Sequence, residues 1–427
     1  MKKISVLLFI CYGLIFPQGG KNQPVIPFHN KIPFYAEVHV IPVDSLNKIS
    51  YIFKIPYDQL VFEKDGIVYN AGIILSVEVY DTSGNFISRQ IKNKELKVED
   101  FDETKSSKLF LQGMVEFLLP NNNYNLNPHV TDVNSNQQVK LNQYLVKKIN
   151  HNFLDFMLPI VVDENKKDID GKLYTVLTNY EGFIPLDNNK YQIIFPSADT
   201  SIENIYVTLV NNKDTVFTGN VSESIKGSNS FIEKDGYIVL TSDENIPVFR
   251  YFILENIGNK MTEGELKIIV AKNKTAKYSE EYNKQVVWFD KPFSLRDSEF
   301  AIKALKYIEP DSVVNKILDV SKAVYGRELY KYWEKFDPTP GTAYNELMNE
   351  YYRRVDYAIL KFAPISGKNG AETDRGNIFI KFGKPGKIER NSDDQGRIIE
   401  TWIYYKQNFT FRFIDKNGNG EFPLVKG

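Results

Sequence analysis

The first part of the chain alternates apolar and polar residues with a period of two. The pattern occurs at residues 34–40, 49–55, 72–80 and 109–119, and Gly, Asn and Asp residues separate the runs. A period of two places successive side chains on opposite faces of a strand, and regular turn residues are typical of antiparallel sheets. We therefore predict an antiparallel β-sandwich domain over residues 21–150, with the Asn-rich residues 121–134 as a long exposed loop.

A second stretch shows the same kind of pattern without repeating the first sequence. Its apolar runs lie at residues 153–162, 190–195, 204–210, 236–241, 248–254 and 265–271. Turn residues recur between them at the spacing expected for a sandwich. The sequence thus predicts a second antiparallel β-sandwich domain over residues 151–276.

The period changes to that of a helix after residue 294. Ile302, Leu305 and Ile308 share one helical face, and a second apolar face begins after Pro310. Proline cannot continue a helix, so two helices are expected here. We interpret residues 277–330 as a helical connector.

A small α+β domain is predicted for residues 331–427. A helix with apolar residues from Leu347 to Phe362 ends before Pro364. Strand-like runs follow at residues 377–382, 398–405, 408–414 and 421–425. The predicted fold class is therefore multidomain and mainly β: two antiparallel β-sandwich domains, a helical connector and a small α+β C-terminal domain.

The N-terminus has the pattern of a secretory signal peptide. Lys2 and Lys3 precede a mostly apolar run, residues 4–16, which is too short to span a membrane, and turn-prone residues follow at 17–20. We predict a signal peptide over residues 1–20, cleaved near residues 18–20. Lipid attachment at Cys11 is disfavoured because the apolar run continues past it. The expected location is the periplasm or cell surface, with no transmembrane segment in the mature chain.

Composition narrows the possible functions. The 427 residues are 42% hydrophobic and 14% aromatic, enough for several cores, and the net charge of −1 gives no general attraction for nucleic acid. The only cysteine lies in the signal peptide, and no two of the four histidines have metal-ligand spacing. The sequence of the turn at residues 415–420 fits a β-hairpin better than a calcium-binding loop. We expect no catalytic residue, metal or cofactor.

Five pieces of the C-terminal domain form a recognisable series: Tyr332-Trp333, residues 337–342, Asn345-Glu346 with residues 351–354, Thr373-Asp374-Arg375-Gly376, and an aromatic hairpin that closes on Asp415 and Gly420. In these pieces the domain resembles the GWxTD domain, a module of secreted bacterial proteins. The motif that names the family would place tryptophan after Gly370, where this chain has Ala371. The resemblance implies a family relationship and no established activity.

A polar cluster is predicted in this domain. Its members are Asp337, Glu346, Arg353, Arg354, Thr373, Asp374 and Arg375. Such a cluster can bind an anionic or sugar ligand. The favoured alternative is structural: Thr373 caps a turn, Asp374 accepts backbone N–H groups, and the arginines join helix to sheet.

Neighbouring tyrosines supply a second set of candidate residues. Tyr352, Tyr404 and Tyr405 each have a tyrosine beside them, so one ring of each pair can face solvent and contact a protein or sugar. In the alternative, both sides of the small sheet are covered and the rings are buried.

The sequence-based hypothesis is an exported, non-enzymatic binding or scaffold protein of the bacterial cell envelope, with an envelope protein or glycan as partner. The first alternative is a carbohydrate- or peptidoglycan-binding protein. The second is a hydrolase that uses only carboxylates, with Asp337, Glu346 and Asp374 as candidates.

Overall fold

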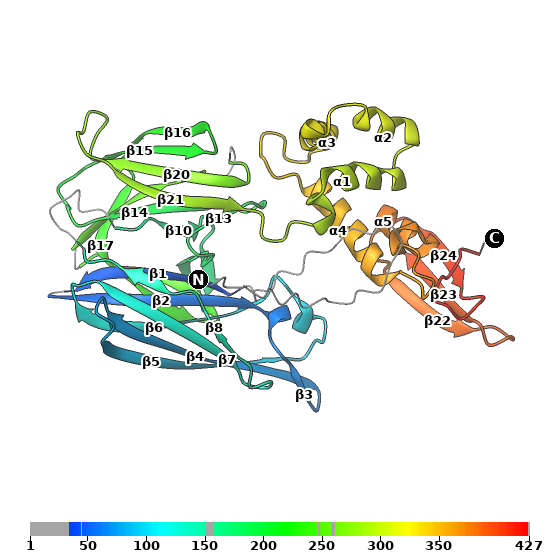
Figure 1. Cartoon of the computed structure of the whole chain (residues 1–427), viewed down its shortest axis with the longest axis horizontal. Helices are drawn as coiled ribbons and strands as arrows, with labels where there is room; N and C mark the ends of the chain where they lie inside the picture. Colours follow the sequence, from blue (N-terminus) through cyan, green and yellow to red (C-terminus); the bar gives the residue numbers. More distant parts are fainter. Residues whose placement is uncertain (1–33, 44, 150–156, 246–247, 258–260, 426–427) are drawn as a thin grey trace, which may run out of the picture. The chain divides into compact units, whose positions relative to one another are not determined.

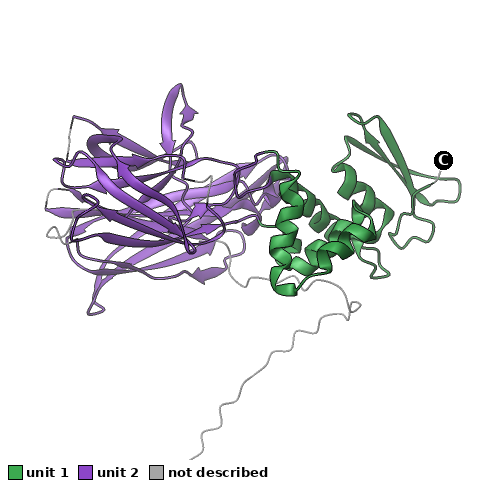
Figure 2. Ribbon diagram, turned by 90° about the horizontal axis from the view of Figure 1, so that it is seen from above, with its two compact units in different colours: residues 1–28, 291–338, 346–427 green, residues 29–290, 339–345 purple. Residues whose placement is uncertain are grey.

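The computed structural model describes residues 34–43, 45–149, 157–245, 248–257 and 261–425. The predicted signal peptide and Cys11 lie outside these residues. The chain forms two compact units (Figure 2): a β unit of residues 29–290 with 339–345, and a C-terminal unit of residues 291–338 with 346–427. The described structure is mainly β with a helical region near residues 298–382 and a C-terminal three-stranded sheet, which confirms the predicted fold class.

The first β domain consists of two sheets packed face to face. One sheet has the order β1 (Tyr35–Val43), β2 (Leu46–Pro56), β6 (Phe110–Pro120). The other is built on β4 (Val68–Asp81) and β7 (Tyr124–Asp132), with β3 (Glu63–Asp65), β5 (Phe86–Val98), β8 (Gln138–Lys140) and β9 (Tyr144–Val146) paired to them.

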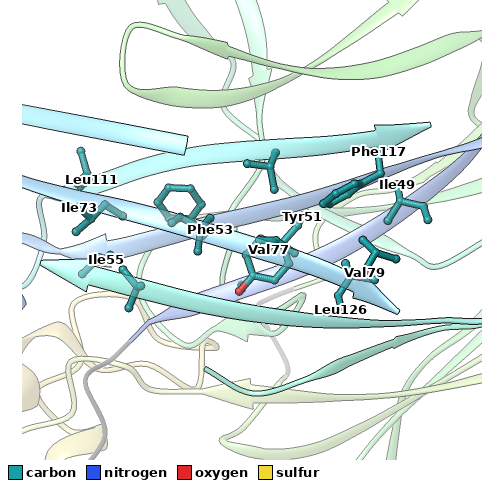
Figure 3. Packing of buried hydrophobic residues seen from close by; sticks show 14 of the residues in the cluster. Ile49, Tyr51, Phe53, Ile55, Ile73, Val77, Val79, Leu111, Phe117 and Leu126 are labelled. Carbon is teal, nitrogen blue, oxygen red and sulfur yellow. The ribbon is translucent and has the colours of Figure 1, made fainter. Parts of the chain in front are cut away.

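The core between these sheets follows from the period of two. Tyr51 and Phe53 of β2 face Val77 of β4 and Leu126 of β7, and all four are fully buried (Figure 3). Burial of one such side chain stabilises the fold by about 2–3 kcal/mol. Tyr51, Phe53 and Val77 lie in the alternating runs that the sequence shows, whereas Leu126 lies in the segment predicted to be a loop.

The predicted loop at residues 121–134 is wrong over most of its length, because β7 occupies Tyr124–Asp132. Tyr124, Leu126 and Val130 are buried on one face, and β7 pairs with β4 along nine residues. The asparagines of this segment alternate with those apolar residues. The Asn-rich composition concealed a strand that has an apolar side.

The second β domain also has two sheets (Figure 1). The seven-stranded sheet has the order β10 (Ile160–Asp163), β14 (Tyr191–Ser197), β19 (Phe249–Leu254), β17 (Ser224–Lys234), β18 (Tyr237–Asp243), β12 (Lys172–Val176), β11 (Lys167–Ile169). The five-stranded sheet has the order β13 (Ile184–Pro185), β21 (Glu280–Val287), β20 (Gly264–Ala271), β15 (Ile205–Asn211), β16 (Asp214–Val221). Because β21 belongs to this sheet, the predicted boundary at residue 276 comes too early.

The two β domains share a core. The β1–β2–β6 sheet has its second face on the second domain, where Ile41 and Ile52 pack in one cluster with Ile160, Phe231 and Tyr251. Strand β2 is consequently buried on both faces along most of its length. This shared packing explains why the two domains form a single compact unit.

The C-terminal unit begins with helices. They are α1 (Ser298–Ala304), α2 (Asp311–Leu318), α3 (Tyr325–Glu334) and α4 (Glu346–Lys361). The Tyr351 and Tyr352 hydroxyls of α4 donate to the carbonyl oxygens of Ala304 and Ala301 at 2.6 and 2.8 Å, so α4 is bonded to the end of α1. Each such bond contributes about 1 kcal/mol.

The rest of the unit differs from the predicted strand pattern. Residues 377–382 belong to a helix, α5 (Asp374–Phe382), and the final run 421–425 makes only an isolated bridge from Leu424 to Phe413. The three-stranded sheet is β22 (Lys387–Ser392), β23 (Ile398–Tyr404) and β24 (Phe409–Ile414). The apolar run at 377–382 was ambiguous, and the N-cap at Thr373 decides for a helix.

Candidate functional site

The Thr373 turn is the N-terminal cap of α5. The Thr373 hydroxyl accepts the Gly376 N–H at 3.0 Å and donates to the Gly370 carbonyl at 2.7 Å. A Cβ at position 376 would collide with that carbonyl oxygen, so glycine is needed for this close approach. Ala371, which stands where the family motif has tryptophan, is fully buried in the same turn.

Arg375 joins α5 to the sheet through a buried charge network. Its guanidinium lies 3.3 Å from the Glu400 carboxylate, donates to the Gly420 carbonyl at 2.8 Å and lies 4.0 Å from the centre of the Phe422 ring. Glu400, which is 2% exposed, also accepts hydrogen bonds from Arg390 at 2.8 Å and Trp402 at 3.2 Å. Only the Nε atom of Arg375 lacks a partner among the described residues.

The other polar candidates lie on neighbouring elements. Asp374 accepts the Leu424 N–H at 2.6 Å. Arg354 pairs with Glu350 one turn away on α4 at 2.7 Å. Asp337 follows α3, Glu346 begins α4 and Arg353 lies within α4, and all three are half-buried. The contacts of Thr373, Asp374 and Arg375 are those of residues that hold helix, sheet and C-terminal segment together.

The candidate aromatics divide into buried and exposed rings. Tyr352 is fully buried, and Tyr404 is buried with its hydroxyl donating to the Gly383 carbonyl at 2.8 Å. Neither can form a contact surface, which corrects that expectation for both. Tyr405 is 66% exposed and lines a shallow pocket of about 450 Å³ with Lys384 and Lys406.

A cavity that the sequence did not reveal lies in the β unit. It has a volume of about 530 Å³ and is lined by residues of both β domains and of the segment 339–345. We call it the Lys54 cavity. Its aromatic lining is Tyr35, Phe110, Tyr180, Tyr191, Tyr237, Phe289 and Tyr344, and its charged lining is Lys54, Asp58, Lys108, Asp163, Asp187 and Asp290.

Lys54 projects from β2 on the face that meets the second β domain. Its ammonium donates to the Thr178 carbonyl at 2.6 Å and lies 3.1 Å from the Tyr180 ring centre and 4.4 Å from that of Phe110. The residue is 5% exposed, and this burial lowers the pKa of its ammonium to about 7, although Asp163 partly opposes the shift. Lys54 is thus an enclosed cation between two aromatic faces.

Two acids of the second β domain have different environments in this cavity. Asp187 accepts the Tyr191 hydroxyl at 2.8 Å and the Asn189 N–H at 2.8 Å. Asp163, at the end of β10, receives no side-chain hydrogen bond from any described residue. Burial raises its carboxyl pKa to about 6, with Lys54 pulling in the opposite direction. An unpaired, half-buried acid of this kind is a typical mark of a functional site.

The loop that carries Tyr180 has a strained backbone. Asn179 and Glu181 have φ angles of 53° and 58°, a region that non-glycine residues seldom adopt, and Gly182 follows with φ 68°. The Oδ1 atom of the buried Asn179 lacks a hydrogen-bond partner among the described residues. Strain and unpaired polar groups are maintained at sites where geometry matters more than stability.

The cavity can hold a small ligand against aromatic rings and carboxylates. Its sequence signal was available in β2: Ile52, Phe53 and Ile55 surround Lys54, so the strand is apolar on both faces and its lysine is enclosed. No group of three His, Cys, Asp or Glu suited to a metal occurs in the described part of the chain. Nor does any described helix have the length and apolarity to cross a membrane.

Comparison with known proteins places one part of the chain in a family. Residues 271–426 match the model of the GWxTD domain, a region that includes Phe289, Asp290 and Tyr344 of the Lys54 cavity. No curated protein matches the chain. A solved structure, the C-terminal domain of the Streptococcus pyogenes antigen I/II-family protein AspA, aligns over 60% of this chain and 98% of its own at 7% identity. The TM-score is 0.17, from which nothing follows about fold or function.

Proposed function

We propose that this chain, whose C-terminal portion is a GWxTD domain, is an exported binding protein of the bacterial cell envelope with its ligand site in the Lys54 cavity. One observation carries the proposal: three parts of the chain line the same cavity. Lys54 comes from the first β domain, Asp163 and Tyr180 from the second, and Phe289 and Tyr344 from the matched GWxTD region.

The composition of the lining supports binding of a small ligand. A volume of about 530 Å³ lies within the range of known small-molecule sites, roughly 300–1,000 Å³. Rings supply apolar contact area, and a few polar groups such as Asp163 fix orientation. Export to the envelope rests on the predicted signal peptide at residues 1–20.

A carbohydrate or peptidoglycan fragment is the second candidate ligand. Sugars have an apolar ring face and many hydroxyl donors, which suits tyrosine rings beside carboxylates and amides. Gln112, Asn188 and Asn189 add such amides to the lining. A carboxylate-only hydrolase is the third candidate. The sequence-based hypothesis named Asp337, Glu346 and Asp374 for it. In the Lys54 cavity the half-buried Asp163, whose carboxyl pKa burial raises to about 6, would be its acid.

The proposal can be tested by crosslinking, since the chain has one cysteine and it lies in the predicted signal peptide. A single cysteine at exposed Asn188, on the cavity rim, carries a photoactivated crosslinker in the mature protein. The control is the same label at exposed Asp394 in the C-terminal unit. We expect one identified envelope glycan or protein to react at 188 and not at 394.

The opposite results are equally informative. If neither position yields a specific adduct, or both yield the same one, the cavity is not the binding site. A glycan array screened with the wild-type protein separates the sugar candidate from a protein partner, and released fragments on that array would indicate a hydrolase. Mass analysis of the exported chain should give an N-terminus near residues 18–20.

A further inference from the structure

The charge of the Lys54 cavity restricts what it can bind. The lining contains four acids and two lysines, which leaves a formal excess of two negative charges; the acids are Asp58, Asp163, Asp187 and Asp290. Lys108 is largely exposed and lies 3.8 Å from Asp290, while Lys54 is enclosed. An anionic ligand would add to the negative excess, whereas a cationic ligand would reduce it.

Asp163 is the acid best placed to bind such a ligand. Asp187 already accepts hydrogen bonds from Tyr191 and Asn189. The carboxylate of Asp163 receives none from a described side chain or amide, yet it is half-buried. Desolvation without a donor is unfavourable for a carboxylate, and a ligand that brings a charged donor removes that cost.

Lys54 does not occupy the position beside Asp163 that we assign to the ammonium group of the ligand. Its ammonium donates to the Thr178 carbonyl and lies against the rings of Tyr180 and Phe110. The ammonium therefore makes its direct contacts with these groups, and it acts on Asp163 only through a longer-range electrostatic interaction. The carboxylate retains room for a second cation from the open side of the cavity.

The rings of the cavity define the rest of the ligand. Tyr180 has its faces occupied by Lys54 and by Phe289, whose ring is stacked at 4.3 Å. Tyr35 and Tyr237 also line the cavity and are half-buried, so their rings are partly open to it. Aromatic rings beside a carboxylate form a favourable environment for an organic ammonium group on a compact, partly apolar frame.

We infer that the Lys54 cavity binds an amino sugar with a free amine, and that Asp163 pairs with the ammonium group of this ligand. The inference rests on the proposed function and narrows its ligand to one class. The hydroxyl groups of the sugar meet the amides of Gln112 and Asn189, and its apolar face meets Tyr35 or Tyr237.

Three closely related probes test the inference on the full mature chain. Glucosamine has the amine, N-acetylglucosamine has it blocked, and glucose lacks it. Isothermal titration at pH 7 should give an affinity for glucosamine at least about tenfold above that for the other two, a difference of about 1.4 kcal/mol. Asp163→Asn should abolish this preference, while Asp394→Asn, an exposed acid outside the β unit, should leave it unchanged.

A pH series needs no variant and gives an independent readout. As pH falls through about 6, Asp163 takes up a proton and glucosamine affinity should drop, although the amine of the ligand stays charged. Asp163→Asn should show no such drop. Thermal melting of each variant confirms that it is folded.

Each other outcome overturns the inference in a recognisable way. Equal affinity for glucose and glucosamine would contradict it and leave sugar binding by the proposed function intact. Glucosamine binding that survives Asp163→Asn would place the amine elsewhere. Absence of binding to all three probes, together with a specific crosslink at position 188, would reject the amino sugar while the cavity remained a binding site.

Discussion

Each unit of the molecule contains a buried charged group, and these two groups lie in opposite environments. In the C-terminal unit, Arg375 and Glu400 bind each other and further groups of the same unit. In the β unit, Asp163 lies half-buried in a cavity without a hydrogen-bond donor from the described residues, and Lys54 has a lowered pKa. Paired burial serves to hold elements together, whereas an unpaired buried acid in a cavity is the arrangement from which we propose a ligand site.

The largest effect is expected where the paired network is broken. Arg375→Met removes the buried cation beside Glu400, which is 2% exposed, and leaves that carboxylate with Trp402 and the exposed Arg390 as its partners. We expect a loss of about 3 kcal/mol in the free energy of unfolding. Urea unfolding of the full chain measures this loss. The control is Arg390→Met, whose side chain is 70% exposed and should matter by less than about 1 kcal/mol. Equal losses for both would show that burial does not distinguish the two arginines.

The second effect concerns Lys54 and depends on pH. The ammonium has a pKa of about 7 in the folded chain against an ordinary 10.5, so between these values the unfolded chain binds more protons. The free energy of unfolding should therefore rise with pH from 7 upward, by roughly 2 kcal/mol, since the contacts to Tyr180 and Phe110 offset part of the burial.

Lys54→Met should remove that rise because methionine does not titrate. Lys213→Met, at an exposed turn position of the same unit, serves as the control for loss of one positive charge. Unfolding curves at pH 6.5, 8 and 9 for the three proteins give the comparison. Parallel pH profiles for wild type and Lys54→Met would mean that the enclosed ammonium keeps its ordinary pKa.

The third expected effect is a gain in stability, whereas substitution of a buried residue usually lowers stability. Burial raises the pKa of Asp163 to about 6, above its ordinary 3.8, so the folded chain binds more protons between these values and loses stability as pH rises through them. At pH 7 Asp163→Asn should be more stable than wild type by about 1 kcal/mol while amino-sugar binding is lost. Thermal melting at pH 4 and 7 measures it, and a variant less stable than wild type at pH 7 would refute an unpaired carboxylate.

The sequence predicted local elements better than contacts between distant residues. The mainly β fold, the alternation in β2 and the cap at Thr373 all follow from short-range residue patterns, which determine the local backbone structure. The change from strand to helix at residues 377–382 could not be predicted, because a six-residue apolar run suits either element and its environment decides.

The Lys54 cavity depends on contacts between distant parts of the chain. Lys54 and Thr178 are 124 residues apart, and Tyr344 reaches the same cavity from beyond the second β domain. Each residue alone resembles an ordinary polar or aromatic position of a strand or loop. The apolar neighbours of Lys54 in β2 indicate an enclosed lysine, but the residues that enclose it are known only from the sharing of the β1–β2–β6 sheet by two cores.

The last comparison concerns two adjacent tyrosine rings of the C-terminal unit. The buried Tyr404 hydroxyl donates to the Gly383 carbonyl at the end of α5, whereas the exposed Tyr405 hydroxyl makes no hydrogen bond with a described residue. Tyr404→Phe leaves that carbonyl without its donor and should lower the free energy of unfolding by about 1 kcal/mol. Tyr405→Phe should change it by less than about 0.5 kcal/mol. Chemical unfolding of both variants decides the matter, and a larger loss for Tyr405→Phe would indicate that the exposed ring has a structural partner.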